Sequence, residues 1–110
     1  MIVSLDYDDT YTRDPELWNQ VVTLMKSRGH TVYVVSARYD RQMDEVYNSV
    51  GSIIGRGNCY STNMQQKREY MAKEYGIFID VWIDDMPEMI VEKDSYTGGL
   101  ILTNKFDPDK

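Results

Sequence analysis

Cysteine and histidine are almost absent from the chain, since Cys59 and His30 are the single representatives of each among 110 residues. One cysteine cannot form an intrachain disulfide, and one cysteine with one histidine does not make a zinc ligand set. Long apolar runs are missing too, because none approaches the roughly 18 residues of a membrane span. The acidic start, MIVSLDYDD, lacks the basic residues of a secretory signal. These absences predict a cytoplasmic protein without a membrane partner.

Basic residues are also scarce. Twelve Lys and Arg against 18 Asp and Glu give a net charge of −6, which argues against a general nucleic-acid coat protein. Part of this acidity lies in two clusters, Asp6, Asp8 and Asp9 near the start and Asp84 and Asp85 near the end. Clustered carboxylates repel one another, and a bound divalent cation is the usual relief.

Short apolar and β-branched runs alternate with amphipathic stretches along the chain. Strands are predicted over residues 1–5, 31–35, 53–54, 79–83 and 100–103, the last after Gly98 and Gly99. Helices are predicted from Asp14 and Pro15 to Gly29, from about Asp40 to Ser49 with Gly51 as the stop, and from a capping box of Asn63 and Gln66 to Gly76. This alternation predicts one α/β domain, residues 1–110, built on a mainly parallel five-stranded sheet.

Polar residues follow three of these strands. Asp6 and Asp8 come after the first, Ser36 after the second, and Asp84 and Asp85 after the fourth. In open parallel sheets, ligands bind beyond the carboxyl ends of the strands. The three groups are far apart in sequence, yet this architecture is expected to bring them to one rim.

Each acidic motif has an ordinary alternative. The pattern Asp6-x-Asp8-x-Thr10 suits a nucleophile or cation ligand beside a proton-transfer group, but Asp is also common in turns and helix caps. The pair of acids at Asp84 and Asp85 can equally be a solvated turn. Oxygen ligands of this kind suit Mg²⁺, which we expect as the cofactor.

Two further positions are candidates for phosphate binding. The Ser36 hydroxyl and the backbone of Ala37 and Arg38 can hold a phosphate oxygen, although Ser often ends a strand and Arg38 can be a surface cation. Lys67 lies at the edge of an apolar stripe, from which it can reach the acids or extend into solvent. Arg68 competes with Lys67 for this role.

Together these residues resemble the haloacid dehalogenase-like (HAD) hydrolase superfamily, over Ile2 to Leu102. The segment IVSLDYDDT is similar to its first motif, VYVVS to its second, Lys67 to its third and VWIDD to its fourth. Short stand-alone chains of this kind are also similar to small phage-encoded members. The resemblance implies a Rossmann-like three-layer α/β/α sandwich with strand order 5-4-1-2-3.

The resemblance also implies roles for the acids. Asp6 would attack phosphorus and form an aspartyl-phosphate, while Asp8 would protonate the leaving group and then activate water. Mg²⁺ would be held by Asp6, the backbone carbonyl of Asp8 and the acid pair, with Asp85 as the direct ligand and Asp84 supporting it.

The remaining roles follow from the same likeness. Ser36 and Lys67 would bind and neutralise the phosphoryl group. The family usually has glycine before the motif-one threonine, where this chain has Asp9. This difference from the family pattern bears more on the rate of hydrolysis than on metal binding.

The spacing of the motifs leaves no room for the cap domain that many family members carry. A short loop separates Thr10 from Pro15, and positions 37–66 are already used by a helix and a strand. An open site implies a bulky phosphate ester, such as a nucleotide, a polynucleotide end or a phosphoprotein. The segment VVSARYDRQ is loosely similar to polynucleotide phosphatase domains.

The leading hypothesis is therefore a Mg²⁺-dependent phosphomonoesterase. A phosphoacceptor domain of the receiver type is an alternative, although receivers carry their phosphorylated Asp on a middle strand. A metal- or phosphate-binding module without turnover is the third possibility.

Overall fold

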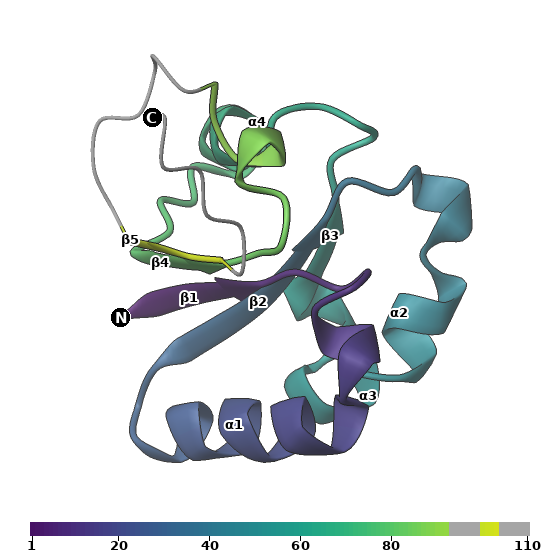
Figure 1. Cartoon of the computed structure of the whole chain (residues 1–110), viewed down its shortest axis with the longest axis vertical. Coiled ribbons are helices and arrows are strands. Elements are labelled where there is room, and N and C mark those ends of the chain that lie inside the picture. Colours follow the sequence, from purple (N-terminus) through teal and green to yellow (C-terminus); the bar gives the residue numbers. More distant parts are fainter. Residues whose placement is uncertain (93–99, 104–110) are drawn as a thin grey trace.

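The computed structural model describes residues 1–92 and 100–103. Their five strands are β1 (Ile2–Leu5), β2 (Thr31–Ser36), β3 (Cys59–Ser61), β4 (Val81–Ile83) and β5 (Leu100–Leu102). All neighbours pair in parallel, in the order β3-β2-β1-β4-β5 (Figure 1). This confirms the expected sheet and its strand order. The predicted Gly98–Gly99 turn lies outside the described residues.

The central strand is β1, which pairs with β2 on one edge and β4 on the other. A central strand of a parallel sheet is covered on both faces, so most of its residues are apolar. Val3 and Leu5 are accordingly buried. In register, Leu5 lies beside Val34 and Ile83, and this alignment brings the ends of three strands to one edge.

Helix α1 (Pro15–Ser27) forms as predicted. The Asp14 side chain accepts a hydrogen bond from the Leu17 amide at 3.1 Å, which satisfies one of the free donors at a helix start. Pro15 occupies the first turn, where its missing N–H costs nothing. The chain leaves the helix through Gly29, whose φ of 86° is a left-handed conformation.

The region between β2 and β3 differs from the prediction. In place of one helix over 40–49, the chain forms a 3₁₀ turn (Asp40–Gln42), helix α2 (Asp44–Asn48), helix α3 (Gly51–Ile54) and a second 3₁₀ turn (Arg56–Asn58). Gly51 begins α3 rather than stopping a helix, and the predicted strand at 53–54 is wrong. Ile53 is exposed and Ile54 buried because α3 turns one side to the core. The third strand is Cys59–Ser61.

Helix α4 (Lys67–Tyr75) begins later than predicted, and the capping box is wrong. Asn63 has a φ of 51°, outside a helix cap, and its Oδ1 accepts a hydrogen bond from the Asp40 amide at 3.0 Å. Gly76 ends the helix in the left-handed conformation, as predicted. A 3₁₀ turn (Pro87–Met89) follows β4.

Helices cover both faces of the sheet (Figure 1). Successive residues of β2 separate the two cores, since Val34 packs with α1, α2 and α3 while Val35 packs with α4. Met71 and Trp82 complete the second core. The three-layer α/β/α arrangement is thus as expected. Within the described residues no helix has the length and apolar character needed to cross a bilayer.

Candidate functional site

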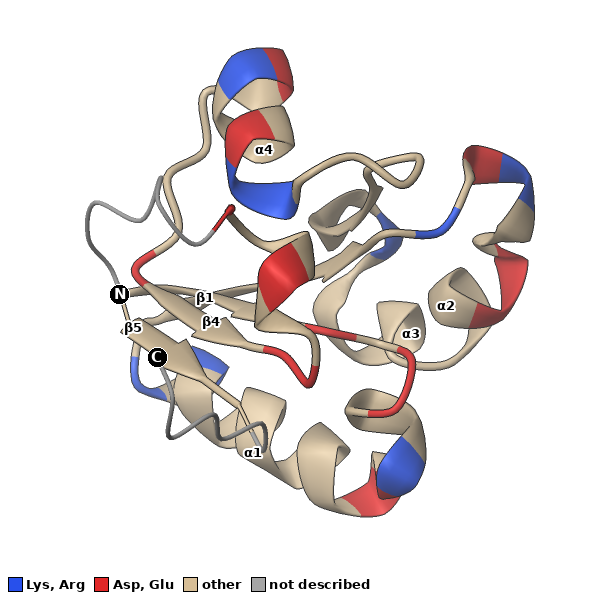
Figure 2. Cartoon of the chain, turned by 45° about the horizontal axis from the view of Figure 1, so that its top comes forward, with Lys and Arg blue, Asp and Glu red and all other residues tan. Residues whose placement is uncertain are grey.

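The acidic loops that follow β1 and β4 lie at the carboxyl edge of the sheet (Figure 2). Asp6 directly follows β1, and its amide donates to the Ile83 carbonyl of β4 at 2.9 Å. Its carboxylate is 7% exposed and accepts a hydrogen bond from the Thr10 hydroxyl at 3.0 Å. These two hydrogen bonds hold Asp6 at the carboxyl edge of the sheet and orient one of its carboxylate oxygens.

Lys67 is the first residue of α4 and is 2% exposed. Its Nζ lies 2.8 Å from Asp6 Oδ1 and 2.6 Å from Asp84 Oδ2. The N-terminus of α4 therefore places the Lys67 ammonium at the edge of the sheet, between the ends of β1 and β4. Of the two lysine placements open from the sequence, the structure shows the one that reaches the acids.

Three carboxylates converge beside this lysine. One oxygen each of Asp6, Asp84 and Asp85 lies within 4.8 Å of the others. Asp84 uses its second oxygen to accept the Met86 amide at 2.9 Å, so both its oxygens have partners. Asp85 is half-buried, and one of its oxygens lies 3.5 Å from the Thr10 hydroxyl.

This donor set fits a hard cation. It supplies only carboxylate oxygens, few enough for Mg²⁺ to keep several waters. Asp85 is the most accessible of the three acids. Both oxygens of Asp6 accept hydrogen bonds, from Lys67 and Thr10, and both oxygens of Asp84 accept them from Lys67 and the Met86 amide. The division of roles between Asp84 and Asp85 stays a prediction.

The electrostatics of the cluster are unbalanced. Burial has the largest effect on Asp6 and raises its pKa. The charge of Lys67 lowers this pKa and the charge of Asp84 raises it, and the net pKa of Asp6 lies above its usual range. Burial lowers the pKa of Lys67, but the charges of Asp6 and Asp84 outweigh burial and raise it. Lys67 contacts two of the three clustered acids, and the excess negative charge of the cluster favours a cation.

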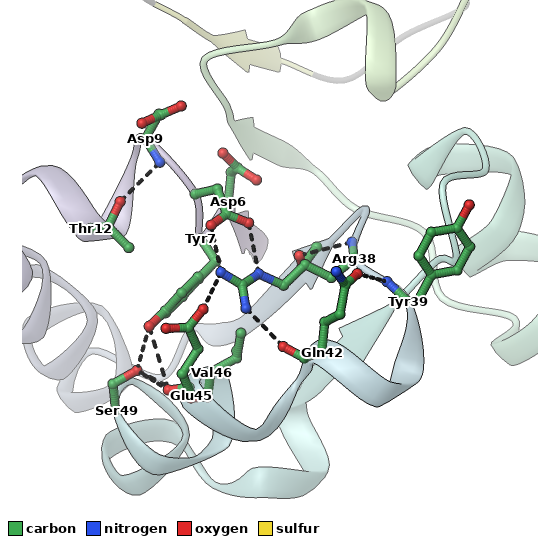
Figure 3. A network of polar contacts seen from close by, with 12 residues as sticks. Asp6, Tyr7, Asp9, Thr12, Arg38, Tyr39, Gln42, Glu45, Val46 and Ser49 are labelled. Atoms are coloured by element: carbon green, nitrogen blue, oxygen red, sulfur yellow. Dashed lines mark hydrogen bonds and ion pairs between the residues drawn. The ribbon is translucent and has the colours of Figure 1, made fainter.

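Asp8 points elsewhere. Its two carboxylate oxygens accept from Arg38 Nη2 at 2.7 Å and Nε at 2.8 Å. Arg38 also pairs with Glu45 and donates to the Gln42 carbonyl at 2.7 Å, and its guanidinium lies 5.1 Å from the centre of the Tyr7 ring (Figure 3). The hydrogen bonds from Arg38 lower the pKa of Asp8. In this arrangement Asp8 is an ionised partner of Arg38.

Ser36 ends β2 and is 1% exposed. Its Oγ accepts the Arg38 amide at 3.2 Å, and its carbonyl accepts the Thr62 amide at 2.8 Å. These bonds shape the turn that carries Ala37 and Arg38 toward the acids. Ser36 thus organises the rim, and its hydroxyl lies beneath the surface rather than along the cavity wall.

A cavity of about 260 Å³ opens over the acids. The site residues predicted from the sequence that line it are Asp6, Asp8, Ala37, Arg38, Lys67, Asp84 and Asp85. The sequence interpretation missed three methionines in the wall, Met64, Met86 and Met89, as well as Gln42. Met86 stands beside the acid pair in sequence, but no pattern marks Met64.

Comparisons of the chain with protein-family models, curated proteins and solved structures find no match. The resemblance to the HAD superfamily that the sequence motifs suggest therefore stays a prediction.

Proposed function

We propose that the chain is a Mg²⁺-dependent phosphomonoesterase of the HAD type that works through an aspartyl-phosphate on Asp6. The observation that supports this most strongly is the buried contact of Lys67 with both Asp6 and Asp84, at 2.8 and 2.6 Å. Burying three charged side chains is costly unless they are paired. Their position at the rim of a parallel sheet is where such folds bind ligands.

In this proposal the residues divide the chemistry among them. Asp6, Asp85 and the backbone carbonyl of Asp8 would hold Mg²⁺, which supplies charge neutralisation for the phosphoryl oxygens. The Asp6 carboxylate attacks phosphorus, so a bond to its oxygen forms as the bond to the leaving alcohol breaks. Lys67 offsets the negative charge that the phosphoryl group brings to the site. Water then attacks phosphorus and frees Asp6.

Asp8 would move the protons in both steps. It gives a proton to the departing alkoxide and takes one from the attacking water. The ion pair with Arg38 must open and Asp8 must take up a proton from solvent before the first step, because a carboxylate held by a guanidinium carries no proton to give. Arg38 keeps Glu45 as a partner when Asp8 leaves.

The substrate proposed is a phosphate ester larger than the cavity itself. About 260 Å³ accommodates a phosphoryl group and little more than one ring. Only residues 6–14 lie between β1 and α1, and short helices fill the chain between β2 and β3. A nucleotide or a phosphorylated polynucleotide end can therefore extend outward without meeting a cap.

The test is hydrolysis of p-nitrophenyl phosphate with Mg²⁺ and with EDTA. Asp6→Asn is expected to lower kcat by about a thousandfold or more, since the nucleophile is lost. Glu74→Gln, an exposed change on α4, is the matched control and should retain the rate. A panel of nucleotides, 3′- and 5′-phosphorylated oligonucleotides and sugar phosphates then identifies the substrate class. Absence of metal-dependent turnover on the whole panel would overturn the proposal.

A phosphoacceptor role is the second candidate, and the Asp8–Arg38 ion pair favours it. If Asp8 stayed on Arg38, it would not take a proton from the attacking water, and the aspartyl-phosphate would persist. Treatment with acetyl phosphate followed by intact-protein mass spectrometry measures its lifetime. A lifetime of minutes or longer indicates signalling, whereas immediate loss indicates a phosphatase.

A further inference from the structure

The cavity over the acids has an apolar wall as well as a charged floor. Met64, Met86 and Met89 line it together with Asp6 and Lys67. Met64 is 54% exposed and Met86 is 44% exposed, so both thioether chains are open to solvent. Single exposed apolar side chains are common at protein surfaces, but several of them lining one cavity are typical of a ligand site.

The Met64 loop is held firmly over the site. The Asn63 amide donates to the Arg38 carbonyl at 3.1 Å, and the Met64 amide donates to the Ala37 carbonyl at 2.8 Å. Met64 has a left-handed backbone, with a φ of 65°, which costs a non-glycine residue free energy. These bonds to the turn after β2 hold Met64 at the cavity mouth.

The other two methionines are fixed from the opposite side. The Met86 amide donates to Asp84 Oδ1 at 2.9 Å, and the Met89 amide donates to the Met86 carbonyl at 2.9 Å. Gln66 Nε2 donates to the Glu88 carbonyl at 2.9 Å, which joins this 3₁₀ turn to the start of α4. The backbones are anchored, while the flexible side chains can adapt to a ligand.

We propose that Met64, Met86 and Met89 form a subsite for the alcohol part of the ester, and that they select alcohols with an aromatic or apolar ring. This rests on the proposed function, because the acids beside the wall would bind the phosphoryl group. The subsite is continuous with them in one cavity. Thioether chains pack well against ring faces and edges.

Charge at the cavity supports the same choice. Asp9, which has no role in the proposed chemistry, lines the cavity as well, and its carboxylate would repel a second anionic group on the alcohol. The volume of about 260 Å³ matches a phosphoryl group with one ring. The preferred substrate is thus an ester whose alcohol part is uncharged and carries a ring next to the phosphoryl group.

The kinetic test compares benzyl phosphate with ethyl phosphate, whose leaving alcohols are similarly acidic. The native chain should prefer the benzyl ester by about tenfold in kcat/KM, the effect of burying roughly 60 Å² of apolar surface. Replacing Met64 and Met86 by alanine together should reduce this ratio to about twofold, and leucine at both positions should restore most of it. Leu24→Ala, an exposed apolar change on α1 that does not line the cavity, should leave the ratio intact.

A binding measurement separates this inference from the proposed function. Benzylphosphonate and ethylphosphonate are titrated with Mg²⁺ into protein carrying ¹³C-methyl methionine, with signals assigned by Met→Leu changes. The methyl signals of Met64, Met86 and Met89 should shift with benzylphosphonate and much less with ethylphosphonate. If these shifts occur but no ester of the substrate panel is hydrolysed, the subsite is supported and the proposed phosphatase function is overturned. Turnover with equal kcat/KM for both esters, or equal shifts, would overturn the subsite alone.

Discussion

At the level of single residues, the buried ammonium of Lys67 lies between two carboxylates that have no other cation this close in the described structure. Asp6 and Asp84 would face each other directly without it. Removing one member of a buried charge cluster leaves the remaining charges uncompensated. The resulting loss of stability is larger than the net stabilisation that the intact ion pair provides.

Lys67→Met, a change of similar length, should lower the free energy of unfolding by about 3 kcal/mol near neutral pH. Burial already raises the pKa of Asp6 in the native chain, and loss of the Lys67 charge, which lowers this pKa, should raise it further. The favourable contribution of a carboxyl with a raised pKa is present below its unfolded pKa and is lost as pH rises through its folded pKa. Urea denaturation at pH 5 and pH 8 should therefore show the larger loss at pH 8.

The control for this prediction is Lys73→Met, an exposed change on the same helix. It should change stability by about 0.5 kcal/mol or less. Equal effects of the two substitutions would contradict the charge role assigned to Lys67.

The meeting of Asp6 with the acid pair could be predicted from sequence because parallel strands end at one edge. Lys67 is a candidate from its place at the edge of an apolar stripe and from the likeness to the third superfamily motif. The direction of Asp8 was not predictable, because its side chain is held by Arg38 from another strand end. Such a contact depends on the turn conformation and on rotamers, which spacing in the chain does not encode.

At the level of elements, the turn after β1 contains a left-handed residue. Asp9 has a φ of 61°, and its amide donates to the Thr12 hydroxyl at 2.9 Å. The superfamily that the sequence motifs resemble usually has glycine here, a residue that adopts this conformation freely. Aspartate tolerates it better than most side chains, so the departure noted in the sequence has a structural explanation.

Substitutions of Asp9 should follow the cost of this conformation. We expect stability to be similar for Gly, Asn and Asp, to fall by about 1 kcal/mol for Ala, and to fall further for Val. Urea denaturation of the series measures this order. Val tolerated as well as Asn would show that the turn adopts another conformation.

Elements with clear boundary signals were the ones predicted well. Asp14, Pro15 and Gly29 bracket α1 as the sequence indicates. The segment from Asp40 to Ser61 was misread, because two adjacent isoleucines suit a strand or a buried helix equally. Tertiary packing decided between these, and packing is not visible in a window of a few residues.

At the level of the whole molecule, three carboxylates from two distant parts of the chain meet at one place. A cation bound there would stabilise the folded state only, because the unfolded chain does not hold the carboxylates together. In the proposed function, metal binding through Asp6 and Asp85 would therefore be linked to folding.

Added Mg²⁺ should raise the melting temperature, with about 2.7 kcal/mol of stabilisation at a hundredfold excess over Kd. KCl at matched ionic strength should give a much smaller shift. Differential scanning calorimetry of Asp6→Asn and Asp85→Asn should show most of the Mg²⁺ effect lost. Asp44→Asn, an exposed change in α2, should retain it, and a full shift in all three variants would exclude this site.

Strand β1 precedes β2 and β4 in the chain yet lies at the middle of the sheet, so one of its edges stays unpaired until β4 adds to it. Until residues 81–83 fold against it, that edge presents unpaired backbone groups to other chains. A folding intermediate without β4 would therefore be prone to aggregation through this edge. It would also lack Asp84 and Asp85 at the edge of the sheet, so the acidic cluster assembles only when β4 pairs with β1.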